Sequence, residues 1–176
     1  MTSGLAKILN IAAALLIALA VIRQCRKPRW WLGRLFARIM NSSHRGLTTW
    51  GLGHLALAKN STILDVGCGG GATIADLALR APEGQVCGVD YSAASVAIAR
   101  GTNADLIESG RVDIRQGSVS AMPFTDEIFD AVTAVETHYY WPNLVSDLKE
   151  VRRVLRPGDR LAIIAEAYRR GGFCCR

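Results

Sequence analysis

From residue 62 onward, short apolar runs alternate regularly with amphipathic stretches. Such runs, bounded by turn residues, are typical of strands buried inside a sheet. They lie at 62–67, 85–90, 111–116, 129–135 and 160–166. We expect each of them to form one strand.

The segments between the first runs are expected to be helical. One helix follows a glycine-rich turn and extends through about Arg80. Ser92 is a suitable N-cap for a second helix that runs to about Ser109. Gly101 weakens the middle of this second helix, because glycine is a poor helix former.

A third helix is marked by a stripe of apolar residues. The stripe has the spacing i, i+4, i+7 and i+11, and consists of Leu144, Leu148, Val151 and Leu155. The pair Pro157-Gly158 is expected to end it. Strands that alternate with helices predict an α/β fold: a doubly wound, mostly parallel sheet of about five strands with helices on both faces.

An apolar segment precedes this α/β body. From Leu5 to Ile22 it would be about 27 Å long as a helix, close to the ~30 Å of a bilayer core. Basic residues and tryptophans follow it, at Arg23, Arg26, Lys27, Arg29, Trp30 and Trp31. Such a flank is typical of a membrane boundary, and its charge favours the cytoplasmic side for the remaining chain. We therefore expect an N-terminal hydrophobic helix, with residues 1–28 as a single-pass membrane anchor and basic flank.

Other interpretations of the apolar segment stay open. Residues 18–20 read Ala-Leu-Ala and resemble a signal-peptidase site, although the basic cluster lies on the wrong side for a signal peptide. The segment could instead be a buried helix or lie on a membrane surface. Residues 29–60 are expected to form an amphipathic helical lead-in that includes Thr48 and Trp50. It would cover the core or act as a lid over a ligand.

The net charge of +6 does not indicate a nucleic-acid partner. Residues 1–40 hold seven basic residues and no acidic one, whereas the remaining chain has a net charge of −1. The excess therefore belongs to the membrane flank, and we expect no nucleic-acid binding. The five cysteines show no metal-binding spacing, so reduced thiols and no metal site are expected.

The sequence "ILDVGCGGG" at 63–71 places glycines directly after the first strand. Ligands of parallel sheets bind at the carboxyl ends of the strands. Gly67, Gly69 and Gly71 leave room there for a ligand beside the backbone, at the start of a helix. The second strand ends in Asp90, whose carboxylate can accept hydrogen bonds from both ribose hydroxyls. Together these features predict a nucleoside-containing cofactor.

The glycines alone do not identify the cofactor. Gly67, Gly69 and Ala72 also fit the dinucleotide fingerprint, so an oxidoreductase that uses a nicotinamide cofactor remains an alternative. Asp65 places negative charge where a pyrophosphate would bind poorly. It favours a ligand that carries positive charge.

Four segments resemble class I S-adenosylmethionine-dependent methyltransferases of the methyltransferase type 11 kind. They are "LDVGCGGG", "GVDYS" (88–92), "GSVSAMPFTDEIFDAV" (117–132) and "EVRRVLRPGDRLAII" (150–164). The resemblance covers about residues 40–166 and has the family's order and spacing. It implies a Rossmann-like fold, S-adenosyl-L-methionine as cofactor and methyl transfer as the activity. Residues 61–176 would form this domain.

The resemblance also implies roles for single residues. Asp65, Gly67, Cys68 and Gly69 would surround the methionine part of the cofactor, and Gly71 is also expected to be a cofactor-binding residue. The ribose and the adenine would contact the remaining set, Asp90, Tyr91, Ser92, Ser118 and Val119. Many relatives have aspartate where this chain has Ser118, which would accept a weaker hydrogen bond from the adenine amino group.

Residues after the fourth strand would lie beneath the reactive sulfonium. Glu136 and Thr137 are the first of these. Catalysis can come mainly from positioning, because the sulfonium already activates the methyl group. A base is needed only where the acceptor must lose a proton, and His138 is the candidate. The alternative is that His138, Tyr139 and Tyr140 form an aromatic wall.

Relatives usually continue past the fifth strand with a helix and two antiparallel strands. We expect this chain to lack those last two strands, which leaves the fifth strand as an exposed edge available for self-association. The acceptor is not identified, although the predicted anchor favours a small-molecule or lipid-like one. A non-catalytic protein that binds the cofactor is the second functional hypothesis.

Overall fold

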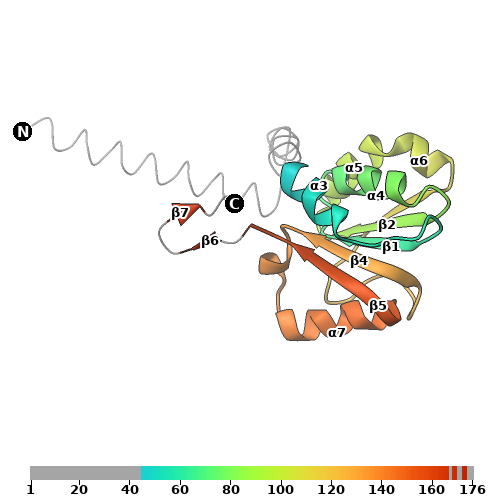
Figure 1. Ribbon diagram of the computed structural model, residues 1–176. Coiled ribbons are helices and arrows are strands. Elements are labelled where there is room, and N and C mark those ends of the chain that lie inside the picture. The colour runs from blue at the N-terminus through green and yellow to red at the C-terminus, as the bar shows by residue number, and fades with distance from the viewer. Residues whose placement is uncertain (1–44, 167, 170–171, 174–176) are drawn as a thin grey trace, which may run out of the picture.

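The computed structural model describes residues 45–166, 168–169 and 172–173 (Figure 1). The predicted anchor at 1–28 and the first part of the lead-in at 29–60 lie outside the described residues. Among the described residues, none of the helices combines the length and the apolar character that crossing a membrane requires.

Five parallel strands form the main sheet, as the alternating pattern predicts. In chain order they are β1 (Thr62–Val66), β2 (Gln85–Asp90), β3 (Val112–Gln116), β4 (Phe129–Val135) and β5 (Leu155–Ile164). Their order in the sheet is β3-β2-β1-β4-β5, and every neighbouring pair is parallel. The carboxyl ends of all five strands therefore lie at one edge of the sheet, where this fold class binds its ligands.

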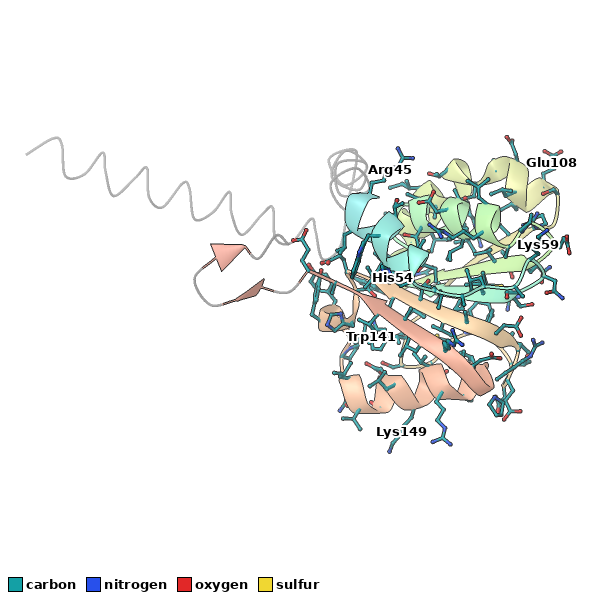
Figure 2. All side chains as sticks on the ribbon, in the orientation of Figure 1. Arg45, His54, Lys59, Glu108, Trp141 and Lys149 are labelled. Atoms are coloured by element: carbon teal, nitrogen blue, oxygen red, sulfur yellow. The ribbon has the colours of Figure 1, made fainter. Side chains whose placement is uncertain are left out.

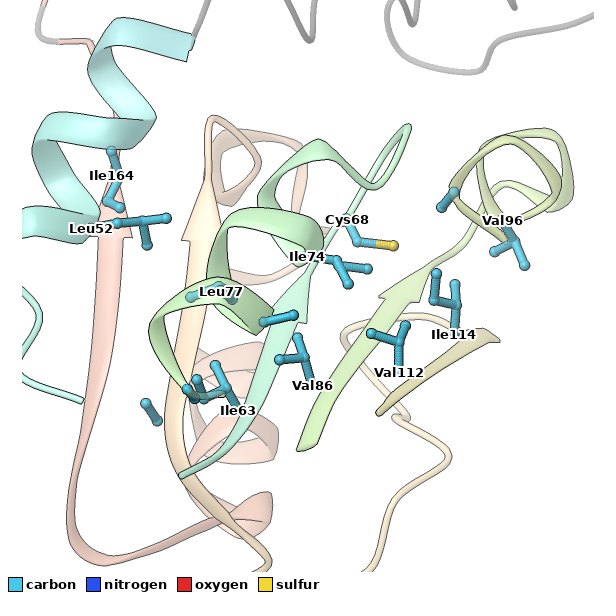
Figure 3. Packing of buried hydrophobic residues seen from close by; sticks show 14 residues of the cluster. Leu52, Ile63, Cys68, Ile74, Leu77, Val86, Val96, Val112, Ile114 and Ile164 are labelled. Carbon is cyan, nitrogen blue, oxygen red and sulfur yellow. The ribbon is translucent and has the colours of Figure 1, made fainter. Parts of the chain in front are cut away.

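Helices cover both faces of the sheet (Figure 1). On one face lie α3 (Arg45–Gly53), α4 (Ala72–Arg80), α5 (Ala93–Thr102) and α6 (Ala104–Glu108), and on the other lies α7 (Leu144–Val154). Successive strand residues alternate between the two apolar layers. Ile63 packs with Leu52 and Ile74 on the first face (Figure 3), whereas Leu64 packs with Val151 on the second.

The helix expected from Ser92 to about Ser109 is interrupted at Asn103 and consists of two helices, α5 and α6. Ser92 is the N-cap, and its Oγ accepts a hydrogen bond from Ser95 N at 3.3 Å. The helix stops at Asn103, and the short α6 follows it. The Asn103 Nδ2 donates to the carbonyl oxygens of Gly71 (3.0 Å) and Ala99 (2.9 Å). The buried amide thus competes for a carbonyl at the end of α5 and fixes the break.

The boundary between α7 and β5 also differs from expectation. The helix ends at Val154, and β5 already begins at Leu155, which pairs with Phe129. The register then shifts, so that Arg160 pairs with Ala131. Pro157-Gly158 therefore lies within an irregular bulge of the strand rather than between a helix and a strand, and Gly158 has φ 88°.

β5 is the outer strand of the main sheet on its side, as expected. Beyond it, β6 (Tyr168–Arg169) and β7 (Gly172–Phe173) pair with each other in a separate antiparallel sheet. These two strands were not predicted from the sequence. Among the described residues they do not extend the main sheet.

Candidate functional site

A cavity of about 490 Å³ opens at the carboxyl ends of the strands. Its wall combines the ends of β1, β2 and β4 with the start of α4 and with residues of α3. The sequence analysis places its candidate ligand-binding residues at this same edge. With Glu136 included, eleven cofactor-binding residues are predicted; ten of them line the cavity, and Gly71 does not.

The glycine loop has left-handed backbone at three positions. Gly67, Gly69 and Gly71 have φ values of 76°, 52° and 81°. A Cβ on Gly69 would have no neighbour closer than 4.0 Å, so the bare backbone there faces open space in the cavity wall. A Cβ on Gly67 would lie 2.6 Å from the Cγ2 of Thr137. The first glycine therefore permits close packing, and the second keeps the cavity open.

Gly71 does not line the cavity, and its predicted contact with the cofactor stays a prediction. A Cβ at this position would lie 2.5 Å from Asn103 Nδ2 and 2.9 Å from Ala99 Cα. Gly71 therefore lets the start of α4 pack against the end of α5. Its contribution is to the packing of the helices behind the loop.

Asp90 connects the end of β2 to the glycine loop. One carboxylate oxygen accepts a hydrogen bond from Gly69 N at 3.0 Å, and the other accepts one from Ser92 N at 2.8 Å. Both oxygens keep lone pairs for further donors. The carboxyl group is buried in the cavity wall, and this burial raises its pKa above the usual 3.8. These two hydrogen bonds thus connect the glycine loop to the residues that follow β2.

Asp65, at the carboxyl end of β1, is more deeply buried. It is 2% exposed, and its Oδ1 accepts a hydrogen bond from Thr133 Oγ1 at 2.7 Å. Burial raises the pKa of Asp65 from 3.8 to about 7. The hydrogen bond from Thr133 lowers this pKa, while the nearby Asp90 raises it further. A cation bound beside Asp65 would favour its ionised form.

The predicted base-binding side is formed after β2 and β3. Tyr91 and Ser92 follow β2 in the cavity wall, and Ser118 and Val119 follow β3. Ser118 Oγ accepts a hydrogen bond from Ser120 N at 3.2 Å. The hydroxyl therefore has a fixed place in the wall, with its proton still available as a donor.

Glu136 lies in the wall after β4, as predicted. It has an uncommon positive φ of 54° and is buried. Its carboxylate accepts hydrogen bonds from the Tyr139 hydroxyl and from Glu166 N, so it links the ends of β4 and β5. Such a strained non-glycine position is a frequent feature of functional sites.

His138 is not among the residues that line the cavity. It belongs to the short 3₁₀ helix η1 (His138–Tyr140), and its Nδ1 is buried without a hydrogen-bond partner in the described part of the chain. Its neighbours Thr137 and Tyr140 do line the cavity. The role of His138 as a base stays a prediction.

Several residues of the wall were not predicted as site residues. Arg45 and Thr48 reach it from α3, and Trp141 reaches it after η1; Figure 2 labels Arg45 and Trp141. Asp76 lies on α4 at the position i+4 from Ala72, which also lines the wall. The helical spacing of these two residues is the signal that sequence reasoning could have used.

The charge of the wall favours a cation. Asp65, Asp76, Asp90 and Glu136 line it, and Arg45 is the one arginine or lysine among the described lining residues. The described residues contain no cluster of three or more histidine, cysteine or acidic side chains that could hold a metal ion. Burial raises the pKa of the Cys68 thiol well above its usual 9.0, which disfavours the reactive thiolate form.

Comparison with known proteins agrees with this chemistry. The family model described as "Methyltransferase domain" matches residues 64–163. A demethylmenaquinone methyltransferase of Lactiplantibacillus plantarum is 35% identical over 124 residues, which are 69% of this chain and 52% of that relative. The chain spans about half the length of the curated relatives it matches.

Two solved structures have a similar fold. One is an S-adenosylmethionine-dependent methyltransferase from Aquifex aeolicus, with a TM-score of 0.68 and 22% identity over 77% of this chain and 75% of the other. The second is the geranyl diphosphate C-methyltransferase from Streptomyces coelicolor in complex with Mg²⁺, geranyl diphosphate and S-adenosyl-L-homocysteine. It has a TM-score of 0.64 and 25% identity, and the match covers 71% of this chain and 46% of that one.

Proposed function

The chain belongs to the methyltransferase domain family, whose members use S-adenosylmethionine, and from this membership we propose that it transfers a methyl group from this cofactor to a small, hydrophobic acceptor. The hydrogen bond between Gly69 N and the Asp90 carboxylate is the observation that carries the proposal. It joins an open stretch of backbone to an acid at the end of the next strand. That is the arrangement required to hold the ribose and the amino-acid part of one ligand.

The residues of the cavity fit the cofactor. Gly69 offers space where any other side chain would project, and Asp90 has lone pairs left for two hydroxyl donors. The wall carries four carboxylates against one guanidinium, which suits a ligand with a sulfonium and an ammonium group. Tyr91 and Val119 offer apolar surface for a base.

The bound cofactor would supply a methyl group already activated by its sulfonium. The chain itself would contribute binding and orientation. Asp90 would accept hydrogen bonds from the ribose hydroxyls, and Asp65 would add negative charge beside the cationic part. The walls formed by Tyr140 and Trp141 would exclude water from the reacting atoms.

An acceptor that loses a proton would require a base. His138 is the base that the sequence predicts, and Glu136 is the carboxylate that lines the cavity at the end of β4. Neither group is needed as a base for an acceptor whose lone pair is already free. The choice between the two is tested by Glu136→Gln and His138→Gln, each compared with the unaltered chain in methyl transfer and in S-adenosylhomocysteine binding.

The acceptor is proposed from two kinds of support. One relative is named a demethylmenaquinone methyltransferase, and one matched structure holds geranyl diphosphate. The apolar segment from Leu5 to Ile22 also supports a location at a membrane.

We therefore include in the proposal a single-pass anchor at 1–28 with the domain on the cytoplasmic side. Alkaline extraction of membranes that contain the full chain tests it, because an anchored chain stays in the pellet.

A titration tests the cofactor. Calorimetry with S-adenosylhomocysteine should show binding, whereas NAD should not bind. Asp90→Ala should abolish the binding of S-adenosylhomocysteine. If the unaltered chain binds NAD instead of S-adenosylhomocysteine, the result would support an oxidoreductase. Transfer of radioactive methyl groups from S-adenosylmethionine in a membrane-containing lysate then separates an enzyme from a protein that only binds the cofactor.

A further inference from the structure

Residues 117–128 connect β3 to β4 and contain no regular helix or strand. The sheet order requires this connection to cross β2 and β1. Such crossovers between parallel strands are usually made by a helix, which satisfies its own backbone hydrogen bonds. Here an irregular segment makes the crossover, and it carries Ser118 and Val119 into the cavity wall. The backbone polar groups of this segment need partners elsewhere.

Three polar residues on one face of α7 bind the segment, two of them through its backbone groups. They are Asp147, Glu150 and Arg153, at positions i, i+3 and i+6, and we call them the α7 polar face. Asp147 Oδ1 accepts a hydrogen bond from Ser120 Oγ at 2.7 Å. Glu150 Oε1 accepts one from Met122 N at 2.8 Å.

Arg153 completes the set of contacts. Its guanidinium donates to the carbonyl oxygen of Phe124 at 2.9 Å and to that of Met122 at 3.2 Å. It also donates to Glu150, with Nη2 2.6 Å from Oε1. Hydrogen bonds that involve charged groups are shorter and stronger than neutral ones. Both backbone groups of Met122 are therefore bound to α7.

The same segment is fixed by apolar contacts beside the polar ones. Met122 and Phe124 are buried together with Val151 and Val154, the buried apolar residues of α7. Within the segment, Ala121 N donates to Ser118 O at 3.1 Å, and Ser120 N donates to Ser118 Oγ at 3.2 Å. Ser118 is thus connected to α7 through a chain of short contacts in which Ser120 is the link.

We propose that Asp147, Glu150 and Arg153 are positioning residues for base recognition, and that they act through Ser120 and Met122 to hold Ser118 and Val119 against the adenine. The proposal rests on the proposed function, because it requires that the cavity binds S-adenosylmethionine. It places control of base selectivity on a helix that does not itself line the cavity.

The test compares the affinities of S-adenosylhomocysteine and S-inosylhomocysteine, in which the adenine amino group is replaced by oxygen. Arg153→Gln should weaken the binding of S-adenosylhomocysteine and reduce the preference for it by roughly two- to tenfold, the effect of losing one or two hydrogen bonds. Arg152→Gln is the matched control, since Arg152 is the exposed neighbour on the same helix. It should leave both affinities unchanged.

Ser120→Ala provides a second variant. Ser120 is exposed, so the variant removes the contact to Asp147 without creating a cavity in the core. It should lower the preference in the same direction. The inference alone would be overturned if Arg153→Gln and Ser120→Ala weakened the binding of both compounds equally. It would also be overturned if the preference for S-adenosylhomocysteine over S-inosylhomocysteine were unchanged in both variants. Absence of S-adenosylhomocysteine binding by the unaltered chain would overturn the proposed function and the inference with it.

Discussion

Thr133 donates a hydrogen bond to Asp65 across two neighbouring strands, and both side chains are buried. The register of β1 and β4 places the two residues directly opposite each other, with 2.7 Å between Thr133 Oγ1 and Asp65 Oδ1. Burial raises the pKa of Asp65 to about 7, and this hydrogen bond is the contact that opposes the rise. The charge of the cavity floor therefore changes close to neutral pH.

This relationship predicts a pH-dependent affinity for the cofactor. S-adenosylhomocysteine carries an ammonium group, so its binding should weaken as the pH falls through about 7 and Asp65 becomes protonated. Thr133→Val removes the hydrogen bond, raises the pKa of Asp65 further and should shift this transition to higher pH. Calorimetric titrations across the neutral range measure the shift. Thr133→Ser retains a hydroxyl and should behave like the unaltered chain; an identical transition in Thr133→Val would contradict the prediction.

The same carboxyl group should destabilise the ligand-free fold at alkaline pH. Between about pH 4 and about pH 7 the folded chain keeps a proton on Asp65 that the unfolded chain has released, so stability falls as the pH rises through this range. Asp65→Asn should remove this loss, which is at most about 4 kcal/mol. Urea unfolding at acidic and alkaline pH checks it. Asp65→Asn should then be more stable than the unaltered chain at alkaline pH, and equal losses in both would count against the assignment.

Asp90→Asn tests the link between β2 and the glycine loop. The substitution weakens the hydrogen bonds that the carboxylate accepts from Gly69 N and Ser92 N and removes its charge. We expect the affinity for S-adenosylhomocysteine to fall by about 1.5–3 kcal/mol, the usual contribution of a hydrogen bond to a charged group. Asp105→Asn, on the exposed surface of α6, is the control and should bind normally. A comparable loss in the control would point to a general charge effect.

Gly69→Ala should mainly reduce cofactor binding, whereas Gly71→Ala should mainly reduce the stability of the fold. Both glycines have positive φ, so each substitution introduces backbone strain of about 1 kcal/mol. The Cβ of Gly71→Ala also meets Asn103 and Ala99, which should destabilise the fold by a further 1–3 kcal/mol or so. The Cβ of Gly69→Ala enters the open cavity and should mainly reduce cofactor binding. Thermal unfolding and titration of both variants distinguish the two effects, and a larger loss of stability in Gly69→Ala would refute the assignment.

Much of the fold could be predicted because its signals are local. The buried strands of a parallel sheet are continuous apolar runs, and the strands at 85–90 and 129–135 have the predicted bounds. The edge of the sheet that binds the ligand was predicted from the glycines and from Asp90, because the carboxyl ends of neighbouring parallel strands lie close together. The hydrogen bond from Gly69 to Asp90 shows that the glycine loop and the end of β2 meet as expected, whereas ligand binding there stays a prediction.

The remaining errors arise from contacts between residues distant in the sequence. The break at Asn103 depends on the carbonyl of Gly71, which lies 32 positions earlier. The close packing of Gly71 against Ala99 and Asn103 was not predicted, because nothing in the sequence shows that these residues meet. Arg45 and Thr48 reach the cavity only because α3 packs beside α4, as the hydrogen bond from Arg80 to the carbonyl of Leu52 shows.

The irregular crossover between β3 and β4 has a consequence for the order in which the chain matures. The contacts predicted for the amino-acid and sugar parts of the cofactor lie within residues 65–92, which can assemble as soon as β1 and β2 pair. The segment at 117–128 has no internal framework, and its anchors on α7 are translated some thirty residues later. In a nascent chain on the ribosome, the proposed binding site for the nucleoside's base should therefore form last, after Arg153 has emerged.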